Sequence, residues 1–594
     1  MTGSRSSTRL AGALLALLFC TTPLAAQVSG PLDIVPETPA LEPLAVEPTP
    51  PAAEPAPEET KKTFEVNKVQ AIDPEAVGLY EEAEGGFGFD MWRGSSRPLI
   101  ERLLPHLPAG VSSRAIDRLD RRLLLSTAAP PEGPRGTSLL ALRIERLAAM
   151  GAGVETNHLL RAAPPGLHHE ALARARLDAL LLTADYVGAC AEARDLVRRD
   201  HVPYWDKVLI FCQALAGQHD AAALGVALLR ESGNEPEPAF LALLRAMAGE
   251  SDVDLSDLRR PTALHLAMLN AAHAPVPAVA VAAADPAIAR AIAFSANTPL
   301  DLRLRAAERA EALGALPVET LAEVYASVPF TSEELANPLS RAADDTGPFG
   351  RALLYQALAR QVVPAARAEV LRAFWKSGRA SGGWGGFATA ARITLEALST
   401  LTPSPELVWI ADDAARALLA AGRFAAARAW FDLAEAQAGA SAEAAAAAAA
   451  LWPLVMLVDD TGALPWDSAR LAAWRKTQAG LSPVDRRLNE ALLFALFDAL
   501  GEPAPIEAQL PLLDGPLRRW SQTLVPVLWR QLRTAAAAGR VGETVLLALI
   551  ALDPGVPEPP GPLALAGAIS ALRRVGLGTE ARALALETAL ARGL

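Results

Sequence analysis

The stretch ALLAAGRFAAARAWFDLAEA, residues 417–436, carries the pattern from which the fold of this chain can be predicted. Small and apolar residues recur on both sides of Gly422 at spacings of three and four, and these spacings place them on one face of a helix. Gly422 marks the turn between the two periodic segments. The stretch therefore predicts two helices that pack against each other as a hairpin.

The same glycine-or-alanine turn occurs elsewhere in the chain. It recurs 33 residues apart at Gly151, Ala184 and Gly217, and it returns at Gly539 and Gly576. A fixed period of twenty to fifty residues is typical of a solenoid, in which each unit is one helical hairpin. A small residue stands five positions after each turn, where it lets the second helix press close to the first; these residues are Thr156, Ala189, Ala222, Ala427, Thr544 and Ala581.

The segments 417–436 and LLLTADYVGACAEARDL, residues 180–196, resemble the tetratricopeptide repeat. The resemblance covers six hairpins and implies an all-α fold, an α-solenoid of stacked helical hairpins. It also implies that the first helix of each hairpin lines a concave face that binds a protein or peptide partner. Residues ten and six positions before a turn would point into that groove; they are Arg174, Asp178, Lys207, Phe211, Asp412 and Arg416.

The composition agrees with helices and with several successive segments. Hydrophobic residues make up 51% of the 594 residues but aromatic residues only 5%, so the apolar mass is mainly alanine and leucine, which favour helices. We predict N-terminal helical repeats over residues 76–260, irregular helical repeats over residues 261–400 and C-terminal helical repeats over residues 401–594.

The first 26 residues have the features of a secretory signal peptide. Two arginines precede an apolar stretch, and cleavage after Ala26 fits the requirement for a small residue at that position. A lipid-modified Cys20 and an uncleaved membrane anchor are two alternatives, although the apolar stretch is shorter than the roughly 20 residues of a membrane span. We therefore expect a periplasmic or secreted protein, with membrane contact only through an uncleaved signal segment.

Residues 27–75 form a Pro/Glu-rich linker that we expect to be disordered. Nine prolines fall between Pro31 and Pro57, which favours extended polyproline conformation. Ten acidic and three basic residues give this segment a net charge of −7, out of −12 for the whole chain. The helical part is almost balanced, so nothing in it suggests a nucleic-acid surface.

Cys190 and Cys212 follow and precede two neighbouring turns, and they could pair in an oxidising compartment. Helix-borne cysteines seldom meet the geometry of a disulfide, so we expect two unlinked core residues.

The sequence contains no signature of catalysis or of cofactor binding. His-Glu-x-x-His, Gly-x-Ser-x-Gly and the phosphate-binding Gly-x4-Gly-Lys-Ser/Thr are all absent. The densest group of metal-ligand types is His168-His169-Glu170, and adjacent histidines on a helix diverge by about 100°. We expect no enzyme activity, no cofactor and no metal site.

Two segments rich in glycine and aromatic residues differ from the helical background. They are EGGFGFDMWRGSSR, residues 84–97, and SGGWGGF, residues 381–387. In the first, Phe87, Phe89 and Trp92 are expected to cover the open end of the solenoid. The alternative is that these residues and Arg93 form a partner-binding hot spot.

The function expected from these features is that of an exported periplasmic scaffold that mediates protein–protein interactions in the cell envelope and performs no chemistry. One alternative is a cell-wall-metabolism enzyme, or its inactive remnant, carried on a solenoid. A second alternative is a structural envelope spacer.

Overall fold

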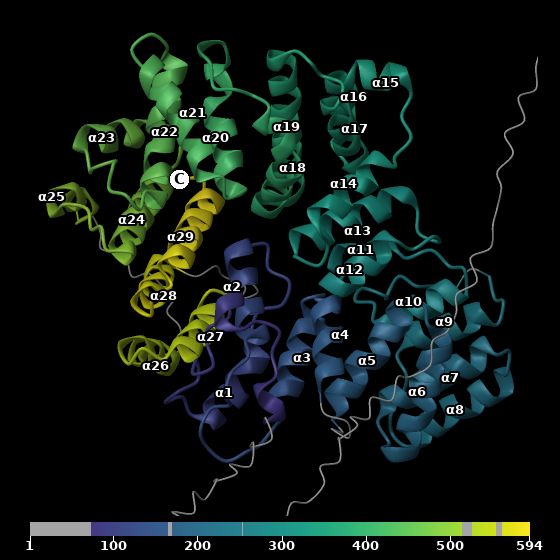
Figure 1. Ribbon diagram of the computed structural model, residues 1–594. Coiled ribbons are helices and arrows are strands. Elements are labelled where there is room, and N and C mark those ends of the chain that lie inside the picture. Colours follow the sequence, from purple (N-terminus) through teal and green to yellow (C-terminus); the bar gives the residue numbers. More distant parts are fainter. Residues whose placement is uncertain (1–72, 164–168, 252, 514–525, 554–560) are drawn as a thin grey trace, which may run out of the picture. The chain divides into compact units, whose positions relative to one another are not determined.

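The computed structural model describes residues 73–163, 169–251, 253–513, 526–553 and 561–594. The predicted signal peptide and almost all of the predicted linker lie outside these residues. Residues 71–594 form one compact unit. Helices make up its regular structure, and apart from the isolated bridges Tyr80–Ser126 and Ser96–Glu132 the described ranges contain no strand. The all-α class is therefore confirmed (Figure 1).

The helices have the following bounds. Before residue 261 they are α1 (Arg97–Leu103), α2 (Arg114–Leu125), α3 (Leu139–Ala149), α4 (Gly153–Ala162), α5 (Glu170–Leu182), α6 (Tyr186–Arg199), α7 (Pro203–Leu215), α8 (His219–Glu231) and α9 (Pro238–Met247). From residue 261 to residue 400 they are α10 (Ala263–Ala271), α11 (Ala278–Ala283), α12 (Pro286–Ala293), α13 (Leu300–Ala312), α14 (Val318–Ala326), α15 (Ser332–Ala336), α16 (Pro338–Asp344), α17 (Pro348–Leu358), α18 (Pro364–Ile393) and α19 (Leu395–Ser399). The remaining helices are α20 (Ala411–Ala420), α21 (Phe424–Gln437), α22 (Ala442–Val458), α23 (Ser468–Thr477), α24 (Pro483–Leu500), α25 (Ile506–Gln509), α26 (Pro526–Ala537), α27 (Val541–Ala551), α28 (Pro562–Arg574) and α29 (Gly578–Arg592). Short 3₁₀ turns cover Pro74–Ala76, Glu82–Glu84, Leu104–His106, Pro405–Ile410, Gln478–Gly480 and Leu510–Leu513.

Each of the six predicted turns joins two consecutive helices that contact each other. The pairs are α3–α4, α5–α6, α7–α8, α20–α21, α26–α27 and α28–α29. All six turn residues have positive φ, from 58° at Ala184 to 88° at Gly576. This left-handed conformation ends a helix at low cost when the residue is glycine, which explains why five of the six positions are glycine.

The small residues predicted at the helix contacts are buried. Ala427 of α21 is 0% exposed, and the equivalent positions in the other five hairpins are at most 5% exposed. A small side chain at each of these positions lets the two helix axes approach closely, so the neighbouring leucines bury their apolar surface. The hairpins therefore form where the sequence places them.

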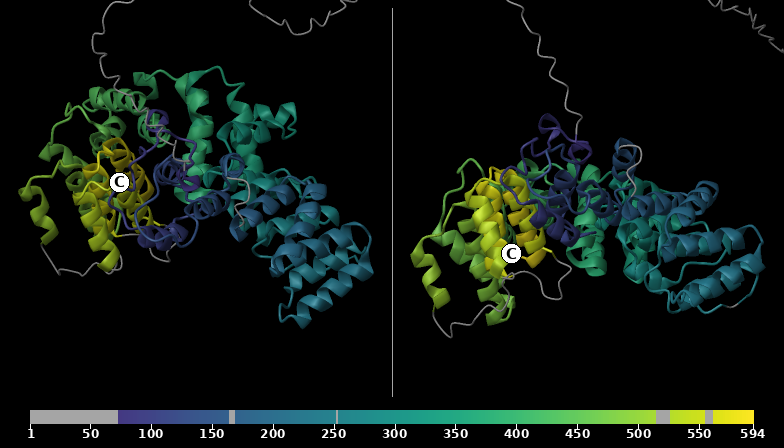
Figure 2. Two further views of the ribbon diagram at one scale, coloured as in Figure 1. Left: turned by 60° about the horizontal axis from the view of Figure 1, so that its bottom comes forward. Right: turned by 90° about the horizontal axis from the view of Figure 1, so that it is seen from below.

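Helices near the start of the described chain pack against helices at its end. α2 contacts both α27 and α29 (Figures 1 and 2). Arg122 of α2 forms an ion pair with Glu580 of α29, and Ser113 and the main-chain nitrogen of Ala115 donate to Glu587 of the same helix. These contacts link residues more than 450 positions apart, which no local pattern could indicate.

The folded unit includes residues that the sequence analysis assigned to the linker. Glu75 accepts hydrogen bonds from both terminal nitrogens of Arg97, at 2.6 and 2.9 Å, and one from the main-chain nitrogen of Leu139 at 3.0 Å. Arg97 is 2% exposed, so its charge requires this carboxylate. Glu75 therefore belongs to the folded unit.

Candidate functional site

A cavity of about 970 Å³ lies among α11, α13, α14, α17 and α18. One wall is the face of α13 that carries Asp301, Arg305, Glu308 and Arg309. The facing wall comes from α18 around residues 378–390, and the loop before α17 contributes residues 345–348. The cavity is the candidate functional site because it combines this volume with charged side chains and exposed main chain.

The wall from α18 is built by the second glycine-aromatic segment, residues 381–387. Helical geometry breaks at Gly382 and at Gly383, where φ is 57°, so α18 consists of two arms. The arms meet where a Cβ added to Gly378 would lie 2.7 Å from the main-chain oxygen of Gly386. No residue other than glycine fits this approach, and the segment therefore has a structural role in shaping the cavity.

A buried carboxylate joins the helices that border the cavity. Glu311 of α13 is 0% exposed and accepts hydrogen bonds from Arg114 and Arg392, each at 2.8 Å, and from the hydroxyl of Thr389. Burial alone would raise the pKa of Glu311, but the arginines and the hydroxyl outweigh burial and lower it. The group is fully partnered, so it holds α2, α13 and α18 together and is not a ligand contact.

A second network occupies the cavity wall between α13, α14 and α17. Glu308 accepts from Nε and Nη2 of Arg351 at 2.8 and 2.6 Å, and from the hydroxyl of Tyr325 at 2.6 Å. Burial raises the pKa of the Tyr325 hydroxyl, and the charge of Glu308 raises it further. Tyr325 is thus a hydrogen-bond donor at neutral pH, and the bidentate Arg351 neutralises Glu308.

Three of the predicted groove residues lie in a row of polar contacts on α5 and α7. Asp178 accepts a hydrogen bond from Tyr204, while the Arg174 guanidinium lies 4.3 Å from the centre of the Tyr204 ring. Lys207 forms an ion pair with Glu237, the residue before α9. These side chains are paired within the protein, so a partner would have to replace existing contacts.

The remaining groove residues lie in different surroundings. Phe211 is 0% exposed and packs edge to face on Tyr186, with ring centres 5.6 Å apart. It belongs to the core because α7 buries that face. Arg416 forms an ion pair with Asp412 at 2.8 Å and also donates to the main-chain oxygen of Leu594. Phe211 therefore does not share a surface with Asp412 and Arg416.

The aromatic residues of segment 84–97 separate by exposure. Trp92 is 7% exposed and contacts α27, where a Cβ added to Gly542 would lie 2.8 Å from its ring. Phe87 is half-buried beneath the guanidinium of Arg122, and Phe89 is 58% exposed. Arg93 is exposed and pairs with Asp90. Trp92 packs between the N-terminal segment and α27, whereas Phe89 and Arg93 are accessible to solvent.

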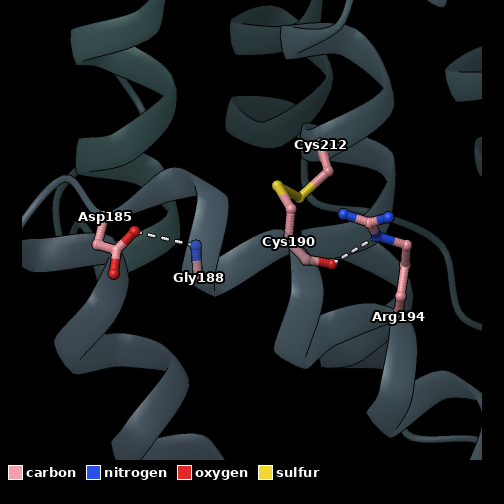
Figure 3. Close-up of a disulfide and its surroundings, with 5 residues drawn as sticks. All are labelled: Asp185, Gly188, Cys190, Arg194 and Cys212. Atoms are coloured by element: carbon pink, nitrogen blue, oxygen red, sulfur yellow. Dashed lines mark hydrogen bonds between the residues drawn. A yellow bond between two sulfur atoms is a disulfide. The ribbon is translucent and has the colours of Figure 1, made fainter.

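The two cysteines on neighbouring helices form a disulfide, contrary to the expectation that they remain unlinked. Cys190 of α6 and Cys212 of α7 have Cα atoms 5.7 Å apart, within the range that a disulfide requires (Figure 3). α6 and α7 are consecutive helices that pack against each other, and this packing brings the two cysteines within reach.

Arg305, Arg309 and the cavity itself were not predicted from the sequence. The sequence feature nearest to the cavity was the glycine-aromatic composition of residues 381–387. It indicated a break in helical regularity but did not indicate a cavity.

Comparisons with protein-family models, curated proteins and solved structures give no match. Among the described residues, no helix is long and apolar enough to cross a membrane, and no group of three or more potential ligands is placed to bind a metal ion.

Proposed function

We propose that this protein is an exported, periplasmic or secreted helical-repeat scaffold that binds another protein or a peptide in the cell envelope. In this proposal the chain performs no chemistry of its own, and its hairpins hold a binding surface in place. The observation that carries the proposal is the cavity of about 970 Å³ between α13 and α18.

The cavity suits a segment of polypeptide in size and composition. Its volume lies at the upper end of the range of about 300–1,000 Å³ for small-molecule sites, and its walls contain both apolar and charged groups. Gly382 has no atom within 4 Å of the position that a side chain would occupy, so a ligand main chain can approach the α18 main chain there. A peptide offers both the hydrogen-bonding groups and the apolar surface that such walls match.

Two observations support the exported location. The sequence of residues 1–26 has the organisation of a secretory signal, and the Cys190–Cys212 disulfide is a bond that persists mainly in oxidising compartments. Export is tested by cell fractionation and N-terminal sequencing. A mature protein that begins at Gln27 in the exported fraction is expected, and a cytosolic protein that begins at Met1 would refute export.

Binding at the cavity is tested by site-specific photo-crosslinking in cells that express the full chain. A photoreactive phenylalanine analogue replaces Ala380, an exposed residue of the cavity wall, and in a matched control it replaces Ala445, an exposed alanine of α22. The proposal expects a discrete protein adduct from position 380 and none from position 445, identified by mass spectrometry. Absence of an adduct at 380, or identical adducts at both positions, would overturn it.

A further inference from the structure

Two arginines on the same face of α13 line the cavity, and neither forms an ion pair with a carboxylate among the described residues. Arg305 and Arg309 are four residues apart, so they lie one above the other, and both line the cavity. Arg305 makes no hydrogen bond or ion pair with any described residue. Arg309 donates from Nε to the main-chain oxygen of Ala284 at 2.7 Å and forms no ion pair within the described ranges.

The carboxylates that line the cavity form no ion pair with Arg305 or Arg309 among the described residues. Glu308 is held by Arg351 and Tyr325, and Asp345 accepts from the main-chain nitrogen of Gly347 at 2.8 Å. Asp301 is one turn before Arg305 on α13, yet no ion pair joins the two in the described structure. Both arginines thus keep donors that are free to bind an anion in the cavity.

Nearby charges act on the two arginines in opposite directions. The like charges at positions i and i+4 repel each other. Burial lowers the pKa of Arg309, because the charged guanidinium loses part of its hydration, while the charge of Asp285 acts in the opposite direction. An anion between the two side chains would offset the repulsion between them.

We propose that the cavity binds an acidic peptide segment whose carboxylates contact Arg305 and Arg309; this inference rests on the proposed function. Four residues of helix rise by about 6 Å. Residues i and i+2 of an extended peptide are about 6.7 Å apart on one face. An extended segment with acidic residues at alternate positions therefore matches the spacing of the two arginines.

The α18 wall admits the main chain of such a segment. The exposed residue Gly382 lines the cavity and has no heavy atom within 4 Å of the position of a Cβ, whereas at Gly385 that position lies 3.1 Å from Ser112 of the loop before α2. The main chain of the peptide can thus approach α18 at Gly382 while alternate side chains turn toward α13. Carboxylates, with bidentate geometry, are the side chains that arginine binds best.

The inference is tested by fluorescence anisotropy with two labelled peptides, Ala-Glu-Ala-Glu-Ala and Ala-Gln-Ala-Gln-Ala, both with blocked ends, against the full chain. We expect the Glu peptide to bind at least about tenfold more tightly than the Gln peptide, and the difference to shrink at high salt. Arg305→Ala should weaken binding of the Glu peptide about tenfold. Arg360→Ala is the control, because Arg360 is exposed and outside the cavity.

The outcomes separate this inference from the proposed function. Arg305 is exposed and forms no hydrogen bond or ion pair with a described residue, so the variant should melt like the unaltered protein, and a loss of binding reports on the ligand rather than on the fold. Equal binding of the two peptides, or a Glu peptide unaffected by Arg305→Ala, would overturn the acidic-peptide inference. If the crosslink at position 380 forms in that case and persists in Arg305→Glu, the scaffold proposal survives; if position 380 captures nothing, the scaffold proposal fails as well.

Discussion

A buried aspartate in α2 allows a quantitative prediction about pH and stability. Asp120 is 1% exposed, and its Oδ1 has no hydrogen-bond partner among the described residues. Burial, together with the charge of Asp117, raises the pKa of Asp120 from its ordinary value of 3.8 to about 8, although Arg146 and Arg121 act in the opposite direction. Asp120 is therefore neutral in the folded protein at pH 7 and ionised in the unfolded chain.

The sign of the effect follows from proton linkage. A carboxyl whose pKa is higher in the folded state costs nothing below pH 3.8, and its penalty grows as the pH rises toward about 8. Each unit of pH between these values costs about 1.36 kcal/mol. In Asp120→Asn the side chain cannot ionise, so the variant should gain stability over the unaltered protein by about 3–4 kcal/mol between pH 5 and pH 8.

The measurement is hydrogen exchange of residues 114–125, read by mass spectrometry at pH 5 and pH 8 and corrected for the intrinsic exchange rate. The difference in opening free energy between Asp120→Asn and the unaltered protein should increase with pH, and any constant cost of the amide cancels in this comparison. Asp195→Asn, at an exposed site of α6, should show no such increase. A difference for Asp120→Asn that is the same at both pH values would refute the reasoning.

Three further predictions concern the packing of the fold. Ala427→Leu should overpack the 0%-exposed contact between α20 and α21 and lower stability by about 1–3 kcal/mol, and unchanged melting would contradict the position assigned to this contact. Trp92→Ala should lower the free energy of unfolding by about 3–5 kcal/mol because the ring is buried on α27. Phe89→Ala should melt like the unaltered protein, because Phe89 is exposed. Equal melting of the two variants would argue against a packing role for Trp92. Replacing Cys190 and Cys212 with serine should lower the free energy of unfolding by about 3 kcal/mol, because it releases a link across 22 residues. The loss is measured as faster proteolysis within α6 and α7. An unchanged rate of proteolysis would show that the disulfide does not stabilise these helices.

The hairpins and their turns could be predicted from the order of residues. Gly151, Gly217 and Gly422 all adopt positive φ between two helices, and the small residues that follow them, such as Ala427, are buried as predicted. Such features are local: helical periodicity and the backbone freedom of glycine act within about twenty residues, so they can be read from the order of residues alone.

The places where hairpins contact each other, and the cavity between them, depend on long-range packing. The contact of α2 with α29 and the burial of Glu311 among three helices depend on packing between segments far apart in the chain. The cavity follows from the same packing, because the break at Gly382 and Gly383 becomes a wall only when α13 lies opposite. In the sequence, Arg305 is one of several arginines on a helix. That it has no ion-pair partner among the described residues depends on the space around it, and long-range contacts that residue order does not reveal set that space.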